Sequence, residues 1–248
     1  MSPPELGARP VHRAPLLAPL LAIETSTTVA RVAVVDAVTG TVLAGAEAAA
    51  ERHSSNLLRL CAEATEKAGA TISALGAIAC GAGPGSFTGL RVAFAVAKGL
   101  AMPTGLPLVL VSSLEALAMD LAPVAAAGEW ILPCLDAGKG QVYAAVYRPL
   151  DGGGVTRELA DWASDPEAVP PSLPPAGRVL CGGPGAVRYR DPLLGGLGAR
   201  GRLAEVAGPS AVSVAARALQ KLRAGEIADL DGAVPSYGRA PDITRPKR

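Results

Sequence analysis

Two stretches of seventeen residues follow the same plan, and this internal repeat constrains the fold more than any other feature. Residues 24–40 read ETSTTVARVAVVDAVTG and residues 136–152 read DAGKGQVYAAVYRPLDG, at a constant offset of 112. Each stretch has an acid after an apolar strand, a turn of small polar residues, a returning strand and a glycine. A further apolar strand runs into Gly-Pro-Gly later in each half, at residues 83–85 and 183–185. The repeat predicts a duplicated α/β chain, with chance repetition of common residues as the alternative.

A strand pair followed by a strand, a glycine turn and a helix indicates mixed sheets flanked by helices. A duplicated hairpin whose first strand ends in an acid resembles the plan of the actin, hexokinase and Hsp70 (ASKHA) superfamily, which has two lobes. The predicted division is a flexible proline-rich extension at 1–19, an N-terminal lobe at 20–112, a C-terminal lobe at 113–234 and a basic tail at 235–248. Within the second lobe, residues 149–177 are rich in Pro and Gly and are expected to form a long connection.

The composition excludes several classes of protein. Half of the 248 residues are hydrophobic, enough for one large core or two lobes of about 100 residues each. With 23 basic and 22 acidic side chains the net charge is +1, so no overall field favours nucleic acid or an anionic membrane. Aromatic residues make up 3%, which argues against an autonomous RNA-binding module. Four cysteines without a CxxC pair indicate reduced thiols and a cytoplasmic location, and no apolar run reaches membrane-spanning length.

Residues 87–102, FTGLRVAFAVAKGLAM, are predicted to form a helix that is apolar almost all the way round. Its only charges are Arg91 and Lys98. Gly or Ala recurs every four positions at 89, 93, 97 and 101, which makes a flat strip on which another backbone could lie close. We therefore expect this helix to be buried on two sides, by its own sheet and by another subunit.

Periodicity predicts three further helices, at 54–68, 113–121 and 213–223, and a strand at 106–111. The helix at 54–68 has one apolar stripe and ends at Gly69, a natural C-terminal stop. Ser113 is the expected N-terminal cap of the helix that begins there.

The glycine loop before the 87–102 helix has two interpretations. Backbone amides at a helix N-terminus bind anions, so GAGPGSFTG could hold a phosphate. The loop lacks the Lys and hydroxyl pair of a Walker loop and the spacing of a dinucleotide fingerprint. A tight turn that packs strand against helix is therefore favoured, with Ser86 and Thr88 as helix caps. The residues of this structural turn are Gly83, Pro84, Gly85, Ser86 and Thr88.

Two acids, Glu24 and Asp136, end the first strand of each repeat. In kinases of this superfamily an acid at that place positions metal or water, so the pair could serve a magnesium nucleotide. The alternative is at least as favoured: the two acids are relics whose hydrogen bonds hold the hairpins. The turn AGKG at 137–140 suits phosphate better than TSTT at 25–28.

Histidine chemistry has little support. The chain has two histidines, His12 and His53, so no HxxxH or HExxH metal pair exists, and no GxSxG elbow accompanies them. His53 precedes a predicted helix and is interpreted as a helix-start or interface residue. We predict no catalytic residue, no cofactor and no metal site.

The tail from residue 235 is basic, with Arg239, Arg245, Lys247 and Arg248 against Asp242. It could contact RNA phosphates or an acidic partner. Such chain ends are more often solvated.

With these residues in view, the chain resembles the TsaB (YeaZ) family from about residue 20 to residue 245. The resemblance rests on LAIETSTTVARVAVVD, HSSNLL, GPGSFTGLRVAFAVAKGLA with LPLVLVSSLEALA, LDAGKGQVYAAVY and PSYGRAPDIT. It implies an ASKHA fold and a noncatalytic paralogue of the transferase TsaD, without the metal-binding histidines of TsaD. The chain departs from the family in its proline-rich extension and in Glu24, where Asp is usual. Both departures weaken any prediction of nucleotide binding.

The resemblance also implies partners. TsaB forms a heterodimer with TsaD and, with the ATPase TsaE, supports threonylcarbamoylation of the adenosine next to the anticodon in tRNAs that read codons starting with A. Alone it forms a homodimer through the same surface, and contact with tRNA is expected only through the complex. Two helices form the family's interface, and they map to 54–68 and 87–101. The expected interface residues are His53, Leu57, Leu58, Cys61, Gly89, Leu90, Arg91, Ala93, Phe94, Ala97, Lys98 and Ala101.

The alternative function is an ATP-dependent small-molecule kinase of the same fold. It would require the AGKG and GGPG turns of the second lobe to bind adenine nucleotide. A peptidase is less favoured, because the sequence offers no set of nucleophile, base and metal ligands.

Overall fold

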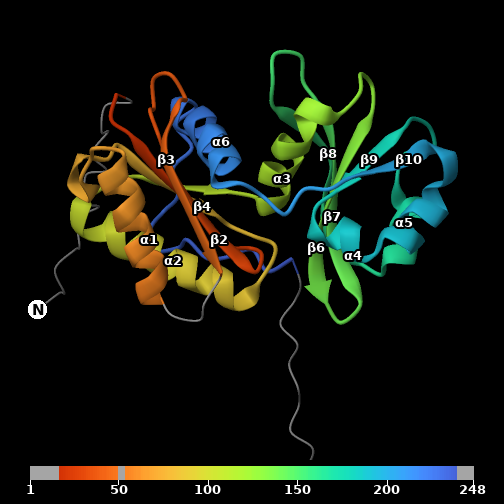
Figure 1. Ribbon diagram of the computed structural model, residues 1–248, viewed down its shortest axis with the longest axis horizontal. Helices are drawn as coiled ribbons and strands as arrows, with labels where there is room; N and C mark the ends of the chain where they lie inside the picture. Colours follow the sequence, from red (N-terminus) through yellow and green to blue (C-terminus); the bar gives the residue numbers. More distant parts are fainter. Residues whose placement is uncertain (1–16, 50–53, 239–248) are drawn as a thin grey trace, which may run out of the picture.

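The computed structural model describes residues 17–49 and 54–238, arranged as two lobes side by side (Figure 1). Each lobe is built on a five-stranded sheet. The strands of the first sheet are β1 (Leu20–Glu24), β2 (Val29–Val35), β3 (Val42–Ala49), β4 (Ala77–Gly81) and β5 (Leu108–Val111). The strands of the second sheet are β6 (Trp130–Gly138), β7 (Gln141–Pro149), β8 (Val155–Ser164), β9 (Val179–Gly182) and β10 (Gly201–Ala204).

The two sheets share one topology, which confirms the duplicated ASKHA fold. From equivalent edges the strand orders are β3-β2-β1-β4-β5 and β8-β7-β6-β9-β10. In each sheet the first two pairings are antiparallel and the last two are parallel. The parallel register of β1 and β4 runs from Leu20 opposite Ala77 to Ile23 opposite Cys80. Both strands therefore end at the same edge, where the TSTT turn and the Gly-Pro-Gly turn meet.

The helices that cover the outer faces of the two sheets differ in length. On the first sheet, α1 (Ser54–Lys67) and α2 (Phe87–Thr104) pack against each other and against the strands. The equivalent face of the second sheet is covered by the short α4 (Pro184–Arg188) and α5 (Arg190–Leu197), with 3-10 turns at Pro166–Ala168 and Pro170–Ser172. Only the first lobe therefore has long helices on the outer face of its sheet.

The two helices between the lobes are exchanged (Figure 1). Helix α3 (Ser113–Leu121) follows the first sheet in sequence but packs on β6, β7 and β8 of the second. Helix α6 (Ala211–Arg223) follows the second sheet but packs on β1, β2, β4 and β5 of the first. The predicted limit between residues 112 and 113 keeps α3 with the sheet it covers, whereas α6 completes the core of the other lobe. The division into independent domains stays a prediction.

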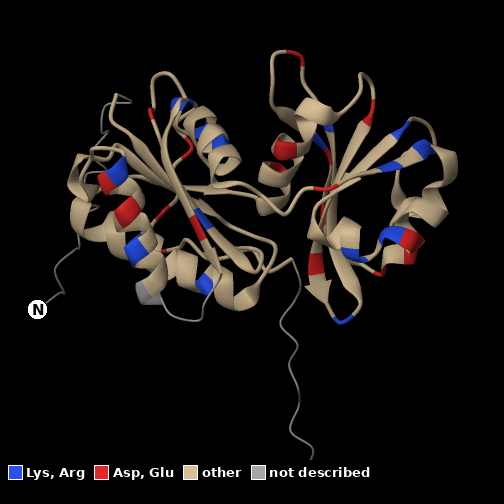
Figure 2. Ribbon diagram, in the orientation of Figure 1, with Lys and Arg blue, Asp and Glu red and all other residues tan. Residues whose placement is uncertain are grey.

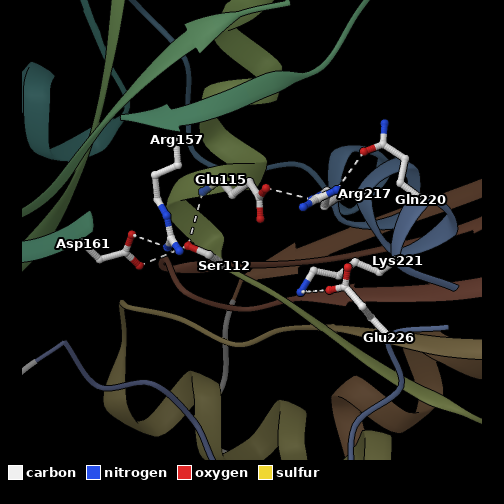
Figure 3. Close-up of polar contacts among 8 residues, drawn as sticks. All are labelled: Ser112, Glu115, Arg157, Asp161, Arg217, Gln220, Lys221 and Glu226. Atoms are coloured by element: carbon white, nitrogen blue, oxygen red, sulfur yellow. Dashed lines mark hydrogen bonds and ion pairs between the residues drawn. The ribbon is translucent and has the colours of Figure 1, made fainter. Parts of the chain in front are cut away.

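Polar contacts join the lobes beside these helices (Figure 3). Arg217 Nε of α6 donates to Glu115 Oε1 of α3 at 2.8 Å. Ser112 Oγ, at the start of α3, donates to Asp161 Oδ2 of β8 at 3.2 Å. Because α6 belongs to the first core and α3 to the second, the Arg217–Glu115 pair connects the two lobes.

The structure corrects the interpretation of residues 149–177 as a long connection. Strand β8 occupies residues 155–164 and pairs with β7 along almost its whole length. It is an edge strand with half of its residues exposed, and it carries three charged residues, Arg157, Glu158 and the partly buried Asp161. Such a strand carries no apolar run, so the Pro and Gly residues around it dominated the prediction.

The last described residues return to the first lobe and lie over the Gly-Pro-Gly turn. Ser236 N donates to Ala82 O at 2.8 Å. Gly238 lies between the lobes, where a Cβ would be 2.7 Å from Tyr143 of β7 and 2.9 Å from Pro84. This C-terminal segment, residues 224–238, therefore contacts both lobes.

Candidate functional site

The turn between β4 and α2 is packed backbone to backbone against the β1–β2 turn. Ser86 caps α2 as predicted, because its Oγ accepts a hydrogen bond from Gly89 N at 3.2 Å. A Cβ on Gly89 would be 2.2 Å from Thr25 O, and one on Gly85 would be 2.4 Å from Ser26 Cβ. Only glycine fits at such close approach, so these residues set where α2 begins.

Two further backbone amides at this turn and the start of α2 are engaged within the chain. Ser86 N donates to Ser26 O at 2.8 Å, and Leu90 N donates to Ser86 O at 2.9 Å. A phosphate cradle at a helix N-terminus needs amide donors that are free to point at the anion. These contacts favour the tight turn over the phosphate cradle. Thr88, the other predicted cap, is exposed.

Glu24, at the end of β1, is 1% exposed. Its Oε1 accepts from Ser26 N at 2.5 Å and its Oε2 accepts from Ser113 Oγ at 2.9 Å. Burial raises the pKa of this carboxyl, and the hydrogen bonds from Ser26 and Ser113 oppose that rise. Gly81 makes room for it, since a Cβ there would be 2.0 Å from Glu24 Oε2. Glu24 thus ties β1 to the start of α3, and Ser112 rather than Ser113 caps that helix.

Asp136, the counterpart in the second lobe, has different partners. Its Oδ1 accepts from Gly138 N at 2.9 Å, and its Oδ2 pairs with Arg188 Nη1 of α4 at 2.6 Å. A magnesium-binding carboxylate needs oxygens directed at the cation and its waters. The contacts of Glu24 and Asp136 instead favour the interpretation that both acids hold their hairpins. Among the described residues, no group of three or more His, Cys, Asp or Glu could hold a metal ion.

The predicted strip on α2 faces inward, which corrects the expected interface. Ala93, Ala97 and Ala101 are 0% exposed and pack in the core of the first lobe. Leu90 and Phe94 are 0% and 5% exposed. The small side chains bring α2 close to its own sheet and to α1, so the chain itself covers them. These five residues offer no surface to another subunit.

The opposite face of α2 is open and nearly uncharged (Figure 2). Its exposed residues include Arg91, Ala95, Gly99 and Met102. Met102 is 47% exposed, and no heavy atom lies within 4 Å of a Cβ placed on Gly99. The sequence alone did not predict this second stripe, Ala95 and Gly99, because its positions alternate with those of the first stripe. The every-four repeat alone does not say which stripe faces the sheet.

Helix α1 extends this open surface. Leu58 is 47% exposed, whereas Leu57 and Cys61 are 4% and 0% exposed and belong to the core. Ala62, one turn after Leu58, is exposed as well. Of the residues predicted on α1, only Leu58 is therefore available to a partner. His53 lies outside the described residues.

A hollow of about 490 Å³, open to solvent, adjoins this surface between α1 and the first turns of α2. Its lining includes Leu57, Leu60, Gly89 and Val92. Thr25 also borders it, and the Thr25 Oγ1 atom is buried without a hydrogen-bond partner in the described part of the chain. The lining is mostly apolar, and Arg59 of α1 stands at its border.

An aromatic cluster stands at the N-terminal end of α2. Phe87 is 56% exposed, and its ring centroid lies 4.8 Å from that of Tyr237 in the C-terminal segment. The Arg91 guanidinium lies 5.2 Å from the Phe87 centroid, a cation–π contact. The other predicted cation of this helix, Lys98, reaches the Asp231 carbonyl oxygen at 3.5 Å. No described helix is long and apolar enough to cross a membrane.

Comparisons of sequence point to one group of proteins. A family model described as TsaD, tRNA N6-adenosine threonylcarbamoyltransferase, matches residues 44–161. The tRNA threonylcarbamoyladenosine biosynthesis protein TsaB of Escherichia coli (strain K12) is 32% identical over 157 residues, which are 60% of this chain and 64% of the relative. TsaB of Haemophilus influenzae is 35% identical over 124 residues, 50% of this chain and 51% of the relative. The chain thus aligns with about half to two thirds of the length of these curated relatives.

Solved structures share the fold over nearly the whole chain. A Pseudomonas aeruginosa protein described as similar to peptidase YeaZ is 28% identical with a TM-score of 0.76, covering 90% of this chain and 100% of its own. YeaZ from the same organism is also 28% identical, with a TM-score of 0.75 over 89% of this chain and 99% of its own. Motifs, sequence relatives and architecture agree in one respect: the chain is similar to TsaB (YeaZ) proteins in sequence and in fold.

Proposed function

We propose that this chain is the noncatalytic partner of a TsaD-type transferase. In that role it supports threonylcarbamoylation of the adenosine next to the anticodon in tRNAs that read codons starting with A. Two findings support the proposal: the relatives are named for threonylcarbamoyladenosine biosynthesis, and the TsaD family model matches residues 44–161, which include α1 and α2.

The observation that carries the proposal is the nearly uncharged outer face of α2, with Leu58 and Ala62 exposed on the neighbouring α1. A helix on the outside of a water-exposed domain normally presents a charged face to solvent. On α2 the exposed residues Ala95, Gly99 and Met102 are uncharged. On α1 Leu58 and Ala62 are exposed next to the Arg59–Glu63 ion pair. Contiguous exposed apolar surface of this kind marks a place where another protein binds. The expected interface therefore moves from the inward faces of these helices to their outward faces.

Small residues at this place suit a helical partner. Ala95 and Gly99 are one turn apart, so a partner helix could approach the backbone of α2 closely there. Leu58 and Met102 would supply most of the apolar area removed from water, at about 25 cal/mol per Å² before the costs of association. Arg91 stands at one end of the strip, where a charge can remain hydrated at the rim.

The wider assembly follows from the same surface. In the absence of its partner, the chain would self-associate through α1 and α2, because the same uncharged area stays open to water. The ATPase TsaE would act on the heterodimer, and tRNA would be engaged by the assembled complex in the cytoplasm. No membrane contact is part of the proposal.

Reconstitution with the cognate TsaD tests the proposal. The full chain should co-elute with TsaD and restore threonylcarbamoylation of tRNA that TsaD and TsaE lack without it. Gly99→Glu places a charge in the middle of the strip and should abolish both. The matched control is Gly195→Glu on α5, because Gly195 is also an exposed helical glycine with no heavy atom within 4 Å of its Cβ position.

Two results would contradict the proposal. A Gly99→Glu variant that binds TsaD with unchanged affinity would remove the outer face of α2 from the interface. A reconstituted mixture whose activity is the same with and without the full chain would remove the activating role.

A further inference from the structure

We propose that residues 236–238 form a clasp between the two lobes, and that a partner on the open face of α2 favours the closed state of this clasp. The first half of the proposal concerns the chain by itself, whereas the second half rests on the proposed function. The clasp is the dark blue end of the C-terminal segment, which lies between the lobes in the lower half of Figure 1, below α3 and α6. It therefore joins the lobes at a different place from the contact between those two helices.

The first part of the C-terminal segment is anchored in the first lobe. Ala228 N donates to Leu108 O of β5 at 2.9 Å, and Ala233 is 8% exposed within the core of that lobe. The next residue, Val234, is 70% exposed. The chain leaves the first core at this point, so residues 236–238 can detach while the part before them stays in place.

The clasp fits closely against both lobes. In the first lobe, Ser236 N donates to Ala82 O at 2.8 Å, and a Cβ on Gly83 would be 2.3 Å from Ser236 O. In the second lobe, a Cβ on Gly238 would be 2.7 Å from the ring of Tyr143, which is 6% exposed and packed too tightly to swing aside. Gly238 also has a φ of +63°, a conformation that favours glycine. A side chain at position 238 would therefore keep the clasp from closing.

The contacts of the clasp are few enough to be broken locally. Residues 236–238 lie outside any helix or strand, and both Ser236 and Gly238 are exposed. Among the described residues, Ser236 N makes the one backbone hydrogen bond of the clasp. Segments with few backbone hydrogen bonds and little buried apolar area open at low free energy. The clasp is therefore expected to open while both lobes stay folded.

The C-terminal segment also runs along one side of the open face of α2. The ring centroid of Tyr237 lies 4.8 Å from that of Phe87, and Lys98 Nζ donates to Asp231 O at 3.5 Å. Phe87 and Lys98 are eleven residues apart, which is about 16 Å along the helix and about 20° around it. Both side chains thus border the same edge of the open face. A partner on that face would lie beside the C-terminal segment.

These contacts couple occupancy of α2 to the state of the clasp. Tyr237 stands between Ser236 and Gly238 in the chain, so its ring packs on Phe87 when the clasp is closed. A partner that contacts this pair of rings gains the contact in the closed state alone. By linkage, the factor by which the partner favours closure equals the factor by which closure raises the affinity for the partner. We expect a factor of about ten.

Hydrogen exchange of the Ser236 amide in the full chain, without a partner, measures closure. Gly238→Ala directs a Cβ at Tyr143 and should reduce the protection of this amide about tenfold. The matched control is Gly225→Ala, because Gly225 lies in the same segment with a φ of +78° but has no heavy atom within 4 Å of its Cβ position. The control carries similar backbone strain without the clash, so it should change the protection less than about twofold.

Distances between the lobes are measured with spin labels on two introduced cysteines. Val38→Cys and Leu150→Cys place the labels in equivalent hairpin turns, after β2 and after β7, at sites that are 55% and 49% exposed. The four native cysteines are buried, so labelling is selective. The distance distribution should be narrow in the labelled parent chain. Gly238→Ala should widen it, and Gly225→Ala should leave it unchanged.

The coupling is tested with the cognate TsaD. Binding of TsaD should raise the protection of the Ser236 amide about tenfold, and Gly238→Ala should weaken TsaD binding by about the same factor. Tyr237→Ala leaves Gly238 in place but removes the ring that packs on Phe87, so TsaD should no longer change the protection in this variant. Gly225→Ala should bind TsaD as the parent chain does.

Three results would overturn the inference. Equal protection of the Ser236 amide in Gly238→Ala and Gly225→Ala would show that the fit of Gly238 does not close the clasp. Equally wide distance distributions in the two variants would show that the clasp does not hold the lobes. Protection that TsaD leaves unchanged in the parent chain would remove the coupling. That last result leaves the proposed function standing, because TsaD binding is measured separately, and a chain that fails to bind TsaD leaves the first two measurements valid.

Discussion

The two lobes have the same sheet and different helices. Five strands repeat in order and direction, but the outer cover of the first sheet is a 14-residue and an 18-residue helix, while that of the second is a 5-residue and an 8-residue helix with 3-10 turns. The sheet is what duplication preserved. The lobes diverged in their outer helices, and the nearly uncharged open face of α2 is the place where we propose that a partner binds.

The largest expected effect is the difference in stability between substitutions on the two faces of α2. Ala97→Glu would bury an unpaired carboxylate at a position that is 0% exposed, and we expect a loss of at least about 4 kcal/mol or failure to fold. Ala95→Glu, two residues away on the open face, should stay within about 0.5 kcal/mol of the parent. Thermal unfolding followed by circular dichroism compares them. Equal stabilities would show that the inward assignment of the alanine strip is mistaken.

The next effect concerns two glycines of the same helix. Gly89→Ala would drive a Cβ to 2.2 Å from Thr25 O, a backbone atom that cannot move aside, and should cost about 2–3 kcal/mol. Gly99→Ala meets no atom and should stabilise the chain by about 0.5–1 kcal/mol through helix propensity. Urea unfolding measures both. A neutral Gly89→Ala would mean that the turn does not fix the start of α2.

Breaking the polar contact between the lobes is expected to have a smaller effect on stability. Glu115→Gln breaks the 2.8 Å pair with Arg217, whose side chain is 30% exposed, so solvent screening limits the loss to about 0.5–1 kcal/mol. The control is Glu226→Gln, which breaks a 3.6 Å pair with Lys221 at a 58% exposed carboxylate and should have no measurable effect. If separate transitions for the two lobes appear in calorimetry of Glu115→Gln, the pair couples them. A single unshifted transition would exclude that role.

The smallest expected effect is a pH dependence of stability, which comes from Glu24 in the first lobe. Burial raises the pKa of Glu24 in the folded chain above its ordinary value of 4.5, so folding favours the protonated carboxyl. Its contribution is fully present below about pH 4.5 and falls as pH rises toward the folded pKa. The melting temperature of Glu24→Gln, relative to the parent, should therefore increase between about pH 4 and pH 7. A relative melting temperature that stays level, or decreases, across this range would contradict the raised pKa.

Much of the fold could be predicted because buried residues recur in short, local patterns along the sequence. The acid, turn and returning strand of each repeat identified β1, β2, β6 and β7, and periodicity identified the helices. Strand β8 was missed because an exposed edge strand with three charges has no apolar signature. The exchange of α3 and α6 was missed as well, since it depends on packing between elements that are far apart in sequence.

The candidate site shows the same limit. The interface expected on α1 and α2 stays a prediction. The inward stripe of α2 is favoured by the sequence because Gly or Ala recurs there without interruption. Ala95 and Gly99 form a second stripe with a less regular pattern, and only the position of the sheet decides between them. The contact of Tyr237 with Phe87 could not be predicted for a different reason. It joins residues 150 positions apart through a segment without secondary structure.

The exchange of α6 has a consequence for how the chain emerges from the ribosome. The face of the first sheet formed by Ala22, Ala33 and Val109 is covered by α6, which begins at Ala211. Synthesis at about 5–20 residues per second leaves that face without its cover for roughly 5–20 s after β5 has been made. During this interval the nascent first lobe exposes an apolar sheet face to the cytosol. Chaperone contacts on the nascent chain should therefore concentrate at lengths between about 110 and 220 residues and end when α6 docks.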